Sequence, residues 1–466
     1  MSQEKLEVEE EYTLKKAVYY SFAGFTDVSL FQFFTFLIFT FYYSVVQLNV
    51  IAITLAFIIW SIWNAINDPL LGAISDRTST KWGRRKPFIL IGLVPLLIVN
   101  VLLWTPPRGN DIASFLYLLI IIIIWEFFYT MYSLNQTSLF PEMFRDLDQR
   151  AKANTSIQFF QIIALLIAFI LPGVFISEFD NPVYFNDFSI AAIVISIICA
   201  FSGFIFIKFG LKERKEFSKD PENAPSFITS LKYTFKNKSF RLYLVGNFSL
   251  WYSFGMLPTV WPLYGDFVLG IQDALIQSLI LGTGFVAAMI FVFPWRIIIN
   301  KLGAKMAYIS ALIVFIATLA PFMFISDVLG GFITFLIWGF GLAGVLIVRD
   351  VTISAIIDED ELNIGIRREA GYYGINGFFV KLTNLLIYTT IALVFIGTDW
   401  AIFDPTTIET ENIFGLRSLM FIFPTIFLVL GIISMIFFPI NKEKYDKLTT
   451  EARKLHLEKK KRVKSF

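Results

Sequence analysis

Long apolar runs alternate with short polar segments along almost the whole chain. A helix needs about 20 mostly apolar residues to cross the roughly 30 Å of hydrocarbon in a bilayer. By this measure the sequence predicts about twelve membrane-spanning helices, so the pattern indicates an all-α membrane protein. The predicted spans are 17–46, 50–75, 87–105, 112–139, 156–178, 188–208, 239–268, 274–298, 304–326, 329–357, 369–397 and 416–440.

Positive charges lie mainly on one side of these spans. Lys and Arg are concentrated in the connections after the second, fourth, sixth and eighth runs and in the C-terminal tail. The connections after the first, third, fifth and eleventh runs contain one cation between them, Arg108. Because cytoplasmic connections carry an excess of Lys and Arg, we expect an even number of spans with both chain ends in the cytoplasm.

The longest polar break divides the chain into two halves. Residues 209–238 are rich in Lys, Glu, Ser and Pro and are interpreted as a cytoplasmic linker between two six-helix bundles, 17–208 and 239–440. A faint repeat agrees, because "KWGRRKP" follows the second span and "NKLGAKM" follows the eighth. Parallel six-helix repeats build one large class of transporters. Residues 1–16 are predicted to be a cytoplasmic segment, and 441–466 a basic cytoplasmic tail that is either solvated or helical on anionic lipid.

Composition narrows the chemistry. The chain is 56% hydrophobic with a mean hydropathy of +0.67, which is more apolar surface than one soluble core can bury. A net charge of +2 gives no reason to expect nucleic acid as a partner. One Cys and one His, His456, exclude disulfide frameworks, Cys/His zinc sites and His-based triads. Since HExxH and GxSxG stretches are also missing from the sequence, we expect no enzyme and no cofactor.

A few charged residues lie inside the predicted spans. Such a charge costs about 2.5 to 3.5 kcal/mol even on insertion scales, so it needs a partner, a wet cavity or a function. At a rise of 1.5 Å per residue, Asp27 and Lys381 both lie near mid-membrane, in opposite halves. We expect them to meet across a polar substrate, or else to form a structural ion pair. Arg349 and Asp350 are adjacent on one helix, so we expect them to pair with other helices.

A second polar group surrounds Asp68. Asn64 and Asp68 are four residues apart and share one helix face, and Pro69 frees a backbone carbonyl about one turn earlier. Glu126 enters the fourth span at a similar depth. These oxygens predict a cation-coupling site, possible for sodium near Asp68 and better suited to a proton at Glu126. Alternatively, Glu126 snorkels or bonds to a neighbouring span.

Three stretches carry a resemblance to a known family. "WNAINDPLLGAISDRTSTKWGRRKPFILIG" resembles the signature between helices two and three of the glycoside-pentoside-hexuronide:cation symporters, the melibiose-permease-like branch of the major facilitator superfamily. "FPEMFRDLDQR" and "DEDELNIGIRREAGYYGINGFFVKLTN" extend the resemblance to both halves. It implies a major facilitator fold and cation-coupled transport of a sugar or glycoside by alternating access. Lysolipid or other amphiphile transport, an uncoupled facilitator and a transport-inactive sensor or scaffold are the alternatives.

The resemblance also implies site residues. Asp27 and Lys381 correspond to the residues that lie near the sugar. Asn64 and Ser133 stand where the family has acids for the cation, which makes proton coupling at least as strong an expectation as sodium. Thr137 stands where a sugar-stacking aromatic is usual. The predicted substrate-binding residues are Asp27, Lys381, Ser133, Thr137, Gln136 and Trp63, and the predicted cation-coupling residues are Asp68, Asn64 and Glu126.

Charged residues at the cytoplasmic ends are predicted to form a gate that closes the inner side. Exposed ion pairs are worth only about 0 to 1 kcal/mol each, which allows a gate to open. The alternative is that these cations only follow the positive-inside rule. The predicted gate residues are Asp76, Arg77, Arg84, Arg85, Glu142, Arg150, Asp358, Glu361, Arg367 and Arg368. We therefore expect a monomeric, multi-pass protein of the plasma membrane whose partners are membrane lipid and a small-molecule substrate.

Overall fold

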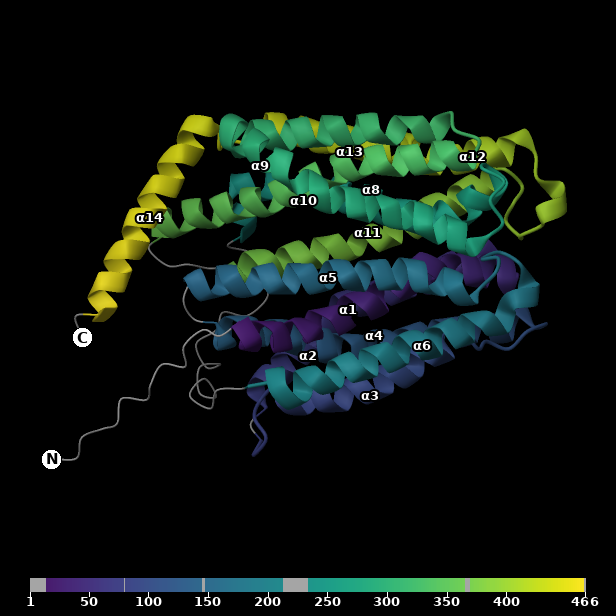
Figure 1. Ribbon diagram of the computed structural model, residues 1–466, viewed down its shortest axis with the longest axis horizontal. Coiled ribbons are helices and arrows are strands. Elements are labelled where there is room, and N and C mark those ends of the chain that lie inside the picture. Colours follow the sequence, from purple (N-terminus) through teal and green to yellow (C-terminus); the bar gives the residue numbers. More distant parts are fainter. Residues whose placement is uncertain (1–13, 79, 145–146, 213–233, 365–368, 465–466) are drawn as a thin grey trace.

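Long helices arranged in two groups make up the protein. The computed structural model describes residues 14–78, 80–144, 147–212, 234–364 and 369–464, and within these ranges it contains helices and connections but no strand. The N-terminal bundle comprises α1 (Leu14–Thr40), α2 (Val50–Arg77), α3 (Lys86–Leu102), α4 (Asp111–Met143), α5 (Leu147–Phe175) and α6 (Phe185–Ile205). The C-terminal bundle comprises α8 (Lys238–Phe267), α9 (Ala274–Leu319), α10 (Val328–Ile364), α11 (Glu369–Gly397), α12 (Thr410–Met420) and α13 (Ile422–Ile436). Figure 1 shows the two bundles side by side, with α1 to α6 below and α8 to α13 above.

The helices account for the predicted number of spans. Nine helices of the described chain are long and apolar enough to cross a membrane. One of them, α9, contains two spans, because Gly303 interrupts it with φ 70° and ψ 173°. The short apolar α3 and the less apolar α8 complete the set of twelve, in which α12 and α13 form one span broken at Phe421. The expectation of about twelve spans in an all-α membrane protein is thus confirmed.

The less apolar composition of α8 follows from its surroundings. Most of its side chains are buried against other helices and do not face lipid. Its hydroxyl groups bond back to carbonyls of the same helix, as Ser249 does to Val245 at 2.8 Å and Thr259 to Gly255 at 2.8 Å. A span that is satisfied in this way tolerates polar residues that hydropathy alone would penalise.

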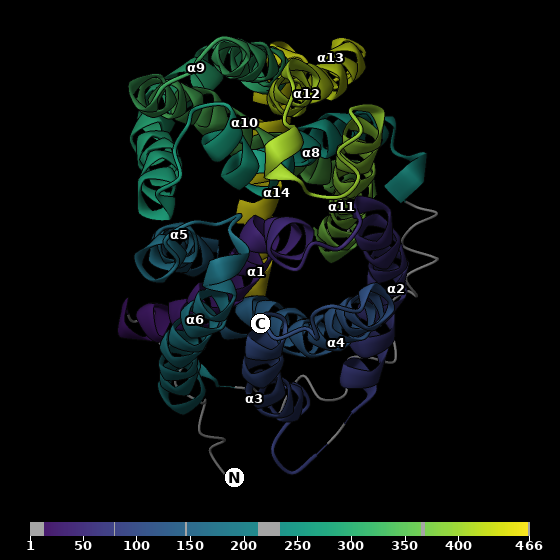
Figure 2. The ribbon, with the colours of Figure 1, turned by 90° about the vertical axis from the view of Figure 1, so that its right-hand side faces the viewer.

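The two bundles are joined closely at one end, which the charge distribution identifies as the outer end. The Tyr43 hydroxyl donates to the carbonyl of Trp400, and the Val50 amide donates to the carbonyl of Ala401 at 2.8 Å. Aromatic pairs across the same seam are Phe39 with Phe395, Phe57 with Tyr388 and Phe169 with Phe285. Figure 2 views the molecule from this end, with the C-terminal bundle above the N-terminal one.

A helix docks at the opposite, cytoplasmic end. α14 (Lys442–Lys464) lies at the end where α1 begins (Figure 1). Lys444 pairs with Glu359 of α10, and Leu448 and Ala452 are buried. The first turns of the tail are therefore helical and packed against the C-terminal bundle. The domain limits given above stay predictions, since residues 213–233 of the linker lie outside the described residues.

Candidate functional site

Lys381 connects the two bundles near the middle of the membrane. It lies on α11, and its Nζ donates to Asn64 Oδ1 at 2.7 Å and to Asp68 Oδ2 at 2.6 Å, both on α2. The same Nζ lies 3.4 Å from Glu126 Oε1 on α4. The side chains of Lys381 and Asp68 are 27% and 30% exposed, whereas Glu126 is fully buried. The Lys381 ammonium therefore contacts two helices of the N-terminal bundle, α2 and α4, at a place that is partly exposed to solvent.

The Glu126 carboxylate is held by neighbouring helices. Trp60 Nε1 donates to Glu126 Oε2 at 3.1 Å. The Thr130 hydroxyl lies 3.2 Å from Glu126 Oε1 and 2.9 Å from Asp68 Oδ1, so its single proton serves one of the two carboxylates at a time. Of the alternatives for Glu126, the structure shows bonding to a neighbouring span and not snorkelling.

Trp60 was not identified from the sequence, although a signal was present. Trp60, Asn64 and Asp68 follow one another at four-residue intervals, so they lie on one face of α2. On α4, Glu126 and Thr130 have the same spacing. The site is thus built from two polar helix faces that meet the side chain of Lys381.

With both acids ionised, the charges of this site do not balance. Asp68 and Glu126 supply two carboxylates, and Lys381 supplies one ammonium. Carboxylate, amide and hydroxyl oxygens surround the ammonium, and oxygen ligands of this kind suit a hard cation. The arrangement can therefore accept one further positive charge, as a proton or as a monovalent ion, with little change in the residues that line it.

Asp27 lies beside this group without being bonded to Lys381. Its Oδ1 atom is buried and finds no hydrogen-bond partner among the described residues. Ser133 and Tyr129 of α4 lie beside the carboxylate, and Lys381 is close enough to act on it electrostatically. The alternative of a direct ion pair between Asp27 and Lys381 is not seen in this conformation, because Lys381 reaches Asp68 and Glu126 instead. Their meeting across a polar substrate stays a prediction. The two predicted sites form one continuous polar region.

The remaining predicted substrate residues lie on the same two helices. Trp63 has a buried indole N–H without a partner in the described part of the chain. Gln136 Nε2 donates to Thr137 Oγ1 at 2.9 Å. The backbone carbonyl of Gln136 accepts from the Tyr20 hydroxyl at 2.5 Å. Gln136 is buried, whereas Thr137 is exposed. Neither contacts Lys381 through a bond that the structure shows.

The gate residues are placed only in part. Arg84 and Arg85 directly precede α3 and are buried. Asp358 and Glu361 lie on α10, and Glu361 is buried. The gate remains a prediction. Asp76, Arg77, Glu142 and Arg150 occupy helical positions whose side chains lie outside the description, and Arg367 and Arg368 lie outside the described residues.

The expectation that Arg349 and Asp350 pair with other helices is wrong. Its Nε lies 3.1 Å from Asp350 Oδ1, so the adjacent residues do pair with each other. The guanidinium also lies 4.8 Å from the centre of the Trp251 ring. A long Arg side chain can turn back along its helix, which the 100° separation of adjacent positions does not prevent.

Two six-helix bundles with a buried ion network between them define a multi-pass membrane transporter of the major facilitator type. The chain belongs to the family of MFS/sugar transport proteins, whose model matches residues 18–442. The resemblance to the melibiose-permease-like symporters is confirmed, as is an integral, multi-pass location in the plasma membrane.

Relatives and solved structures agree with this assignment. An uncharacterized symporter of Synechocystis is 24% identical and covers 82% of this chain and 86% of its own. The sodium-dependent lysophosphatidylcholine symporter 1 of Gallus gallus is 21% identical over 86% of this chain and 82% of its own. The crystal structure of nucleoside transporter NupG superposes with a TM-score of 0.64 at 14% identity, over 91% of this chain and 99% of its own. The last comparison supports the fold alone.

Proposed function

We propose that this protein is a secondary transporter that moves a sugar or glycoside by alternating access, coupled to a cation. A proton is at least as good a candidate as sodium. The observation that carries the proposal is the bond network of Lys381 with Asn64, Asp68 and Glu126, which joins the two bundles at mid-membrane. A junction made of ions can be released by exchanging one cation for another, which a packed apolar junction does not permit.

Coupling follows from competition for the same oxygens. The Lys381 ammonium occupies the position that a bound cation would take between Asp68 and Glu126. A proton or sodium ion arriving there weakens the hold on Lys381 and frees it to bind a substrate hydroxyl beside Asp27. Because the cation and the substrate both change the same equilibrium, each raises the affinity for the other.

The described conformation supports access from the cytoplasm. The outer seam is closed by packed aromatic rings and backbone bonds. Toward the cytoplasmic end of α11, Tyr373 is 43% exposed, and a Cβ at Gly374 or Gly377 would meet no described atom within 4 Å. Lys381 lies between these two regions, at the inner edge of the closed seam.

Unused hydrogen-bonding groups favour a polyhydroxyl substrate. Asp27 Oδ1 is an acceptor and Trp63 Nε1 a donor, and both are buried without a partner in the described chain. A sugar offers hydroxyl groups to such atoms and an apolar ring face to an indole. The family description, which names sugar transport, agrees with this class.

Purified protein in proteoliposomes tests the proposal. Thermal-shift screening of sugars, glycosides, uronides and lysolipids, with and without sodium and at two pH values, identifies the ligand, since binding stabilises the folded state. Uptake of that ligand is then measured under an imposed proton or sodium gradient. We expect a sugar or glycoside to be accumulated under one of them. Unchanged uptake by Lys381→Ala would refute the central site.

A lysolipid is the second candidate. It is favoured by the similarity to the lysophosphatidylcholine symporter and by the 53 Phe residues of the chain, although Phe facing lipid explains many of them. Stabilisation and uptake of a lysolipid, with no response to any sugar, would select this candidate. Binding of a ligand without flux would indicate a transport-inactive sensor.

A further inference from the structure

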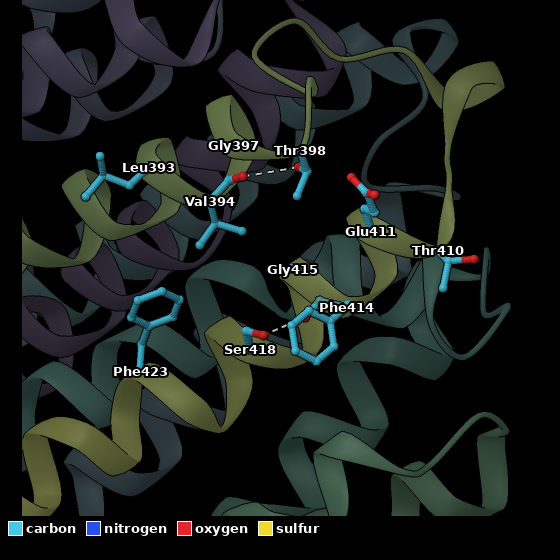
Figure 3. A pocket seen from close by; sticks show the side chains of 10 residues that line it. All are labelled: Leu393, Val394, Gly397, Thr398, Thr410, Glu411, Phe414, Gly415, Ser418 and Phe423. Carbon is cyan, nitrogen blue, oxygen red and sulfur yellow. Dashed lines mark hydrogen bonds between the residues drawn. The ribbon is translucent and has the colours of Figure 1, made fainter.

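An open groove lies between α11 and the broken last span, at the outer end of the helix that also carries Lys381. It has a volume of about 750 Å³, within the range of small-molecule sites. The lining residues are Leu393, Val394, Gly397, Thr398, Thr410, Glu411, Phe414, Gly415, Ser418 and Phe423. Figure 3 shows that they come from two walls, α11 on one side and α12 with the start of α13 on the other.

The local sequence explains why a hollow forms here. At Phe421, between α12 and α13, φ is −130° and ψ is −55°, so the last span changes direction below Ser418. Gly397 leaves room on the facing helix, because a Cβ there would meet no described atom within 4 Å. At Gly415, in contrast, a Cβ would lie 2.8 Å from Val394, so the two walls meet closely at that level.

The groove has the dimensions of one leaflet. Glu411 and Met420 are nine positions apart in α12, which corresponds to about 14 Å along the helix, and the lining continues to Phe423 at the start of α13. Half of the hydrocarbon core is about 15 Å thick. Because Thr410 begins α12 at the outer end, the groove runs from the outer surface to about mid-membrane. This is the depth that one acyl chain of an outer-leaflet lipid occupies.

The groove has few polar groups, and its one charged group, Glu411, lies at the outer rim. Thr398 Oγ1 donates to the Val394 carbonyl at 3.1 Å and Ser418 Oγ to the Phe414 carbonyl at 2.7 Å, so these hydroxyl protons are already used (Figure 3). Glu411 is exposed and forms no ion pair with any described residue. It is the charged group that this site offers to a ligand.

The surroundings of Glu411 are acidic. Residues 398–412 contain four carboxylates and no Lys or Arg. The nearest cation along the chain, Arg417, donates to the carbonyls of Met323 and Ile325 and does not line the groove. An anionic headgroup would be repelled at this rim, whereas a primary amine would donate charge-assisted hydrogen bonds to the carboxylate.

We propose that this groove binds an outer-leaflet phospholipid with a primary-amine headgroup, that is, a phosphatidylethanolamine. One acyl chain lies between α11 and α12, and the amine binds the Glu411 carboxylate. Lipid tails are as apolar as the groove itself, so the contact of the chain does not distinguish one lipid from another. Selection among lipids therefore depends on Glu411, and retention of the chain depends on the open space at Gly397. The proposal is independent of the transported substrate.

Native mass spectrometry of the full-length protein tests it, with equal amounts of dioleoyl phosphatidylethanolamine, phosphatidylcholine and phosphatidylglycerol. The expected result is roughly tenfold more retained phosphatidylethanolamine than either competitor, as one charge-assisted contact allows. Equal retention of the three lipids, or preference for phosphatidylglycerol, would overturn the proposal.

Two variants separate the roles of shape and charge. Gly397→Trp fills the groove and should abolish lipid retention, while Ile396→Trp, at the same depth on a 43% exposed position outside the lining, should leave it unchanged. Glu411→Gln should equalise the retention of phosphatidylethanolamine and phosphatidylcholine. Asp399→Asn, in the connection before α12 and outside the lining, is the matched control. Retention of selectivity in Glu411→Gln, or of lipid in a folded Gly397→Trp, contradicts the assignment.

A photoreactive phosphatidylethanolamine gives the location. With the reactive group near the end of the acyl chain, cross-links should fall on peptides that contain Leu393 or Phe423. Cross-links confined to other helices would show that the retained lipid lies elsewhere and would overturn the proposed site.

Discussion

The two bundles are joined in two places by different kinds of contact. At mid-membrane, Lys381 bonds to Asp68 and Glu126, and the site is partly open to accessible space. At the outer seam, aromatic rings stack and backbone groups bond, as in the pair Phe57 and Tyr388, whose ring centres are 3.7 Å apart. The ionic junction responds to a change of charge, whereas the packed seam responds to loss of shape. A transporter needs both kinds of contact. The ionic junction changes when a ligand binds, and the packed seam excludes water from the closed side.

The largest effect is expected at the ionic junction. Lys381→Ala leaves two carboxylates facing each other without a cation, and breaking a buried pair in this way costs about 3 to 5 kcal/mol. We expect uptake to fall to background while the protein remains in the membrane. Proteoliposome uptake and thermal unfolding of the purified variant measure the two effects separately.

Adding a second substitution shows whether Lys381→Ala loses uptake because the protein is destabilised or because the ammonium itself is missing. Lys381→Ala combined with Glu126→Gln removes one carboxylate, so most of the lost stability should return. Uptake should not return, because the ammonium that competes with the cation is still missing. Recovery of uptake in the double variant would show that Lys381 has only a structural role.

The next effect is expected at the packed seam. Phe57→Ala removes a fully buried ring, a change that costs about 3 to 5 kcal/mol in a well-packed core. Because the ring stacks on Tyr388 across the bundles, the closed outer end loses stability and outward-open molecules become more populated. A cysteine at Thr54, in a Cys199→Ser background, should react faster with a membrane-impermeant maleimide. Ile62→Ala, at an exposed position of α2, is the control and should not change the rate.

The seam also contains a group that titrates. Asp180, in the connection before α6, lies against Asp266 at the end of α8 in the other bundle, and Glu178 is nearby. Burial raises the pKa of the Asp180 carboxyl above its ordinary value. The protonated acid is therefore favoured while the seam is closed, and its contribution to closure is present at low pH and lost as pH rises through the raised pKa.

This pH dependence is measurable with the same cysteine at Thr54. Labelling should accelerate as pH rises above the ordinary range of an Asp carboxyl, after correction for maleimide reactivity with a free thiol. Asp180→Asn keeps the shape and removes one of the two facing carboxyl groups, so its corrected rate should change less with pH than that of the wild type. A wild-type rate that falls with pH would contradict the assignment of Asp180 to the seam.

The sequence reveals the spans more fully than the site. Hydrocarbon thickness imposes a length on every span, so the runs of apolar residues predict the twelve helices, and two polar faces on α2 and α4 are readable from four-residue spacing. The partner of Lys381 is not readable, because it depends on how α11 is rotated against α2 and α4. Likewise, the groove beside Gly397 depends on the change of direction at Phe421, which apolar periodicity does not encode.

The smallest effect is expected at a lysine–carboxylate pair that lies at the cytoplasmic end and does not join the bundles. Lys444 pairs with Glu359 within the C-terminal bundle, and the side chains are 41% and 13% exposed. Glu359 also accepts a bond from Ser239 at 2.7 Å, so it keeps a partner when the lysine is removed. Lys444→Ala should therefore cost about 0 to 1 kcal/mol of stability and leave uptake unchanged. Thermal unfolding and uptake, measured beside Lys381→Ala, compare two lysine-carboxylate pairs that differ in burial and in whether they join the bundles. A loss of uptake in Lys444→Ala as large as that in Lys381→Ala would mean that position between the bundles is not what makes Lys381 essential.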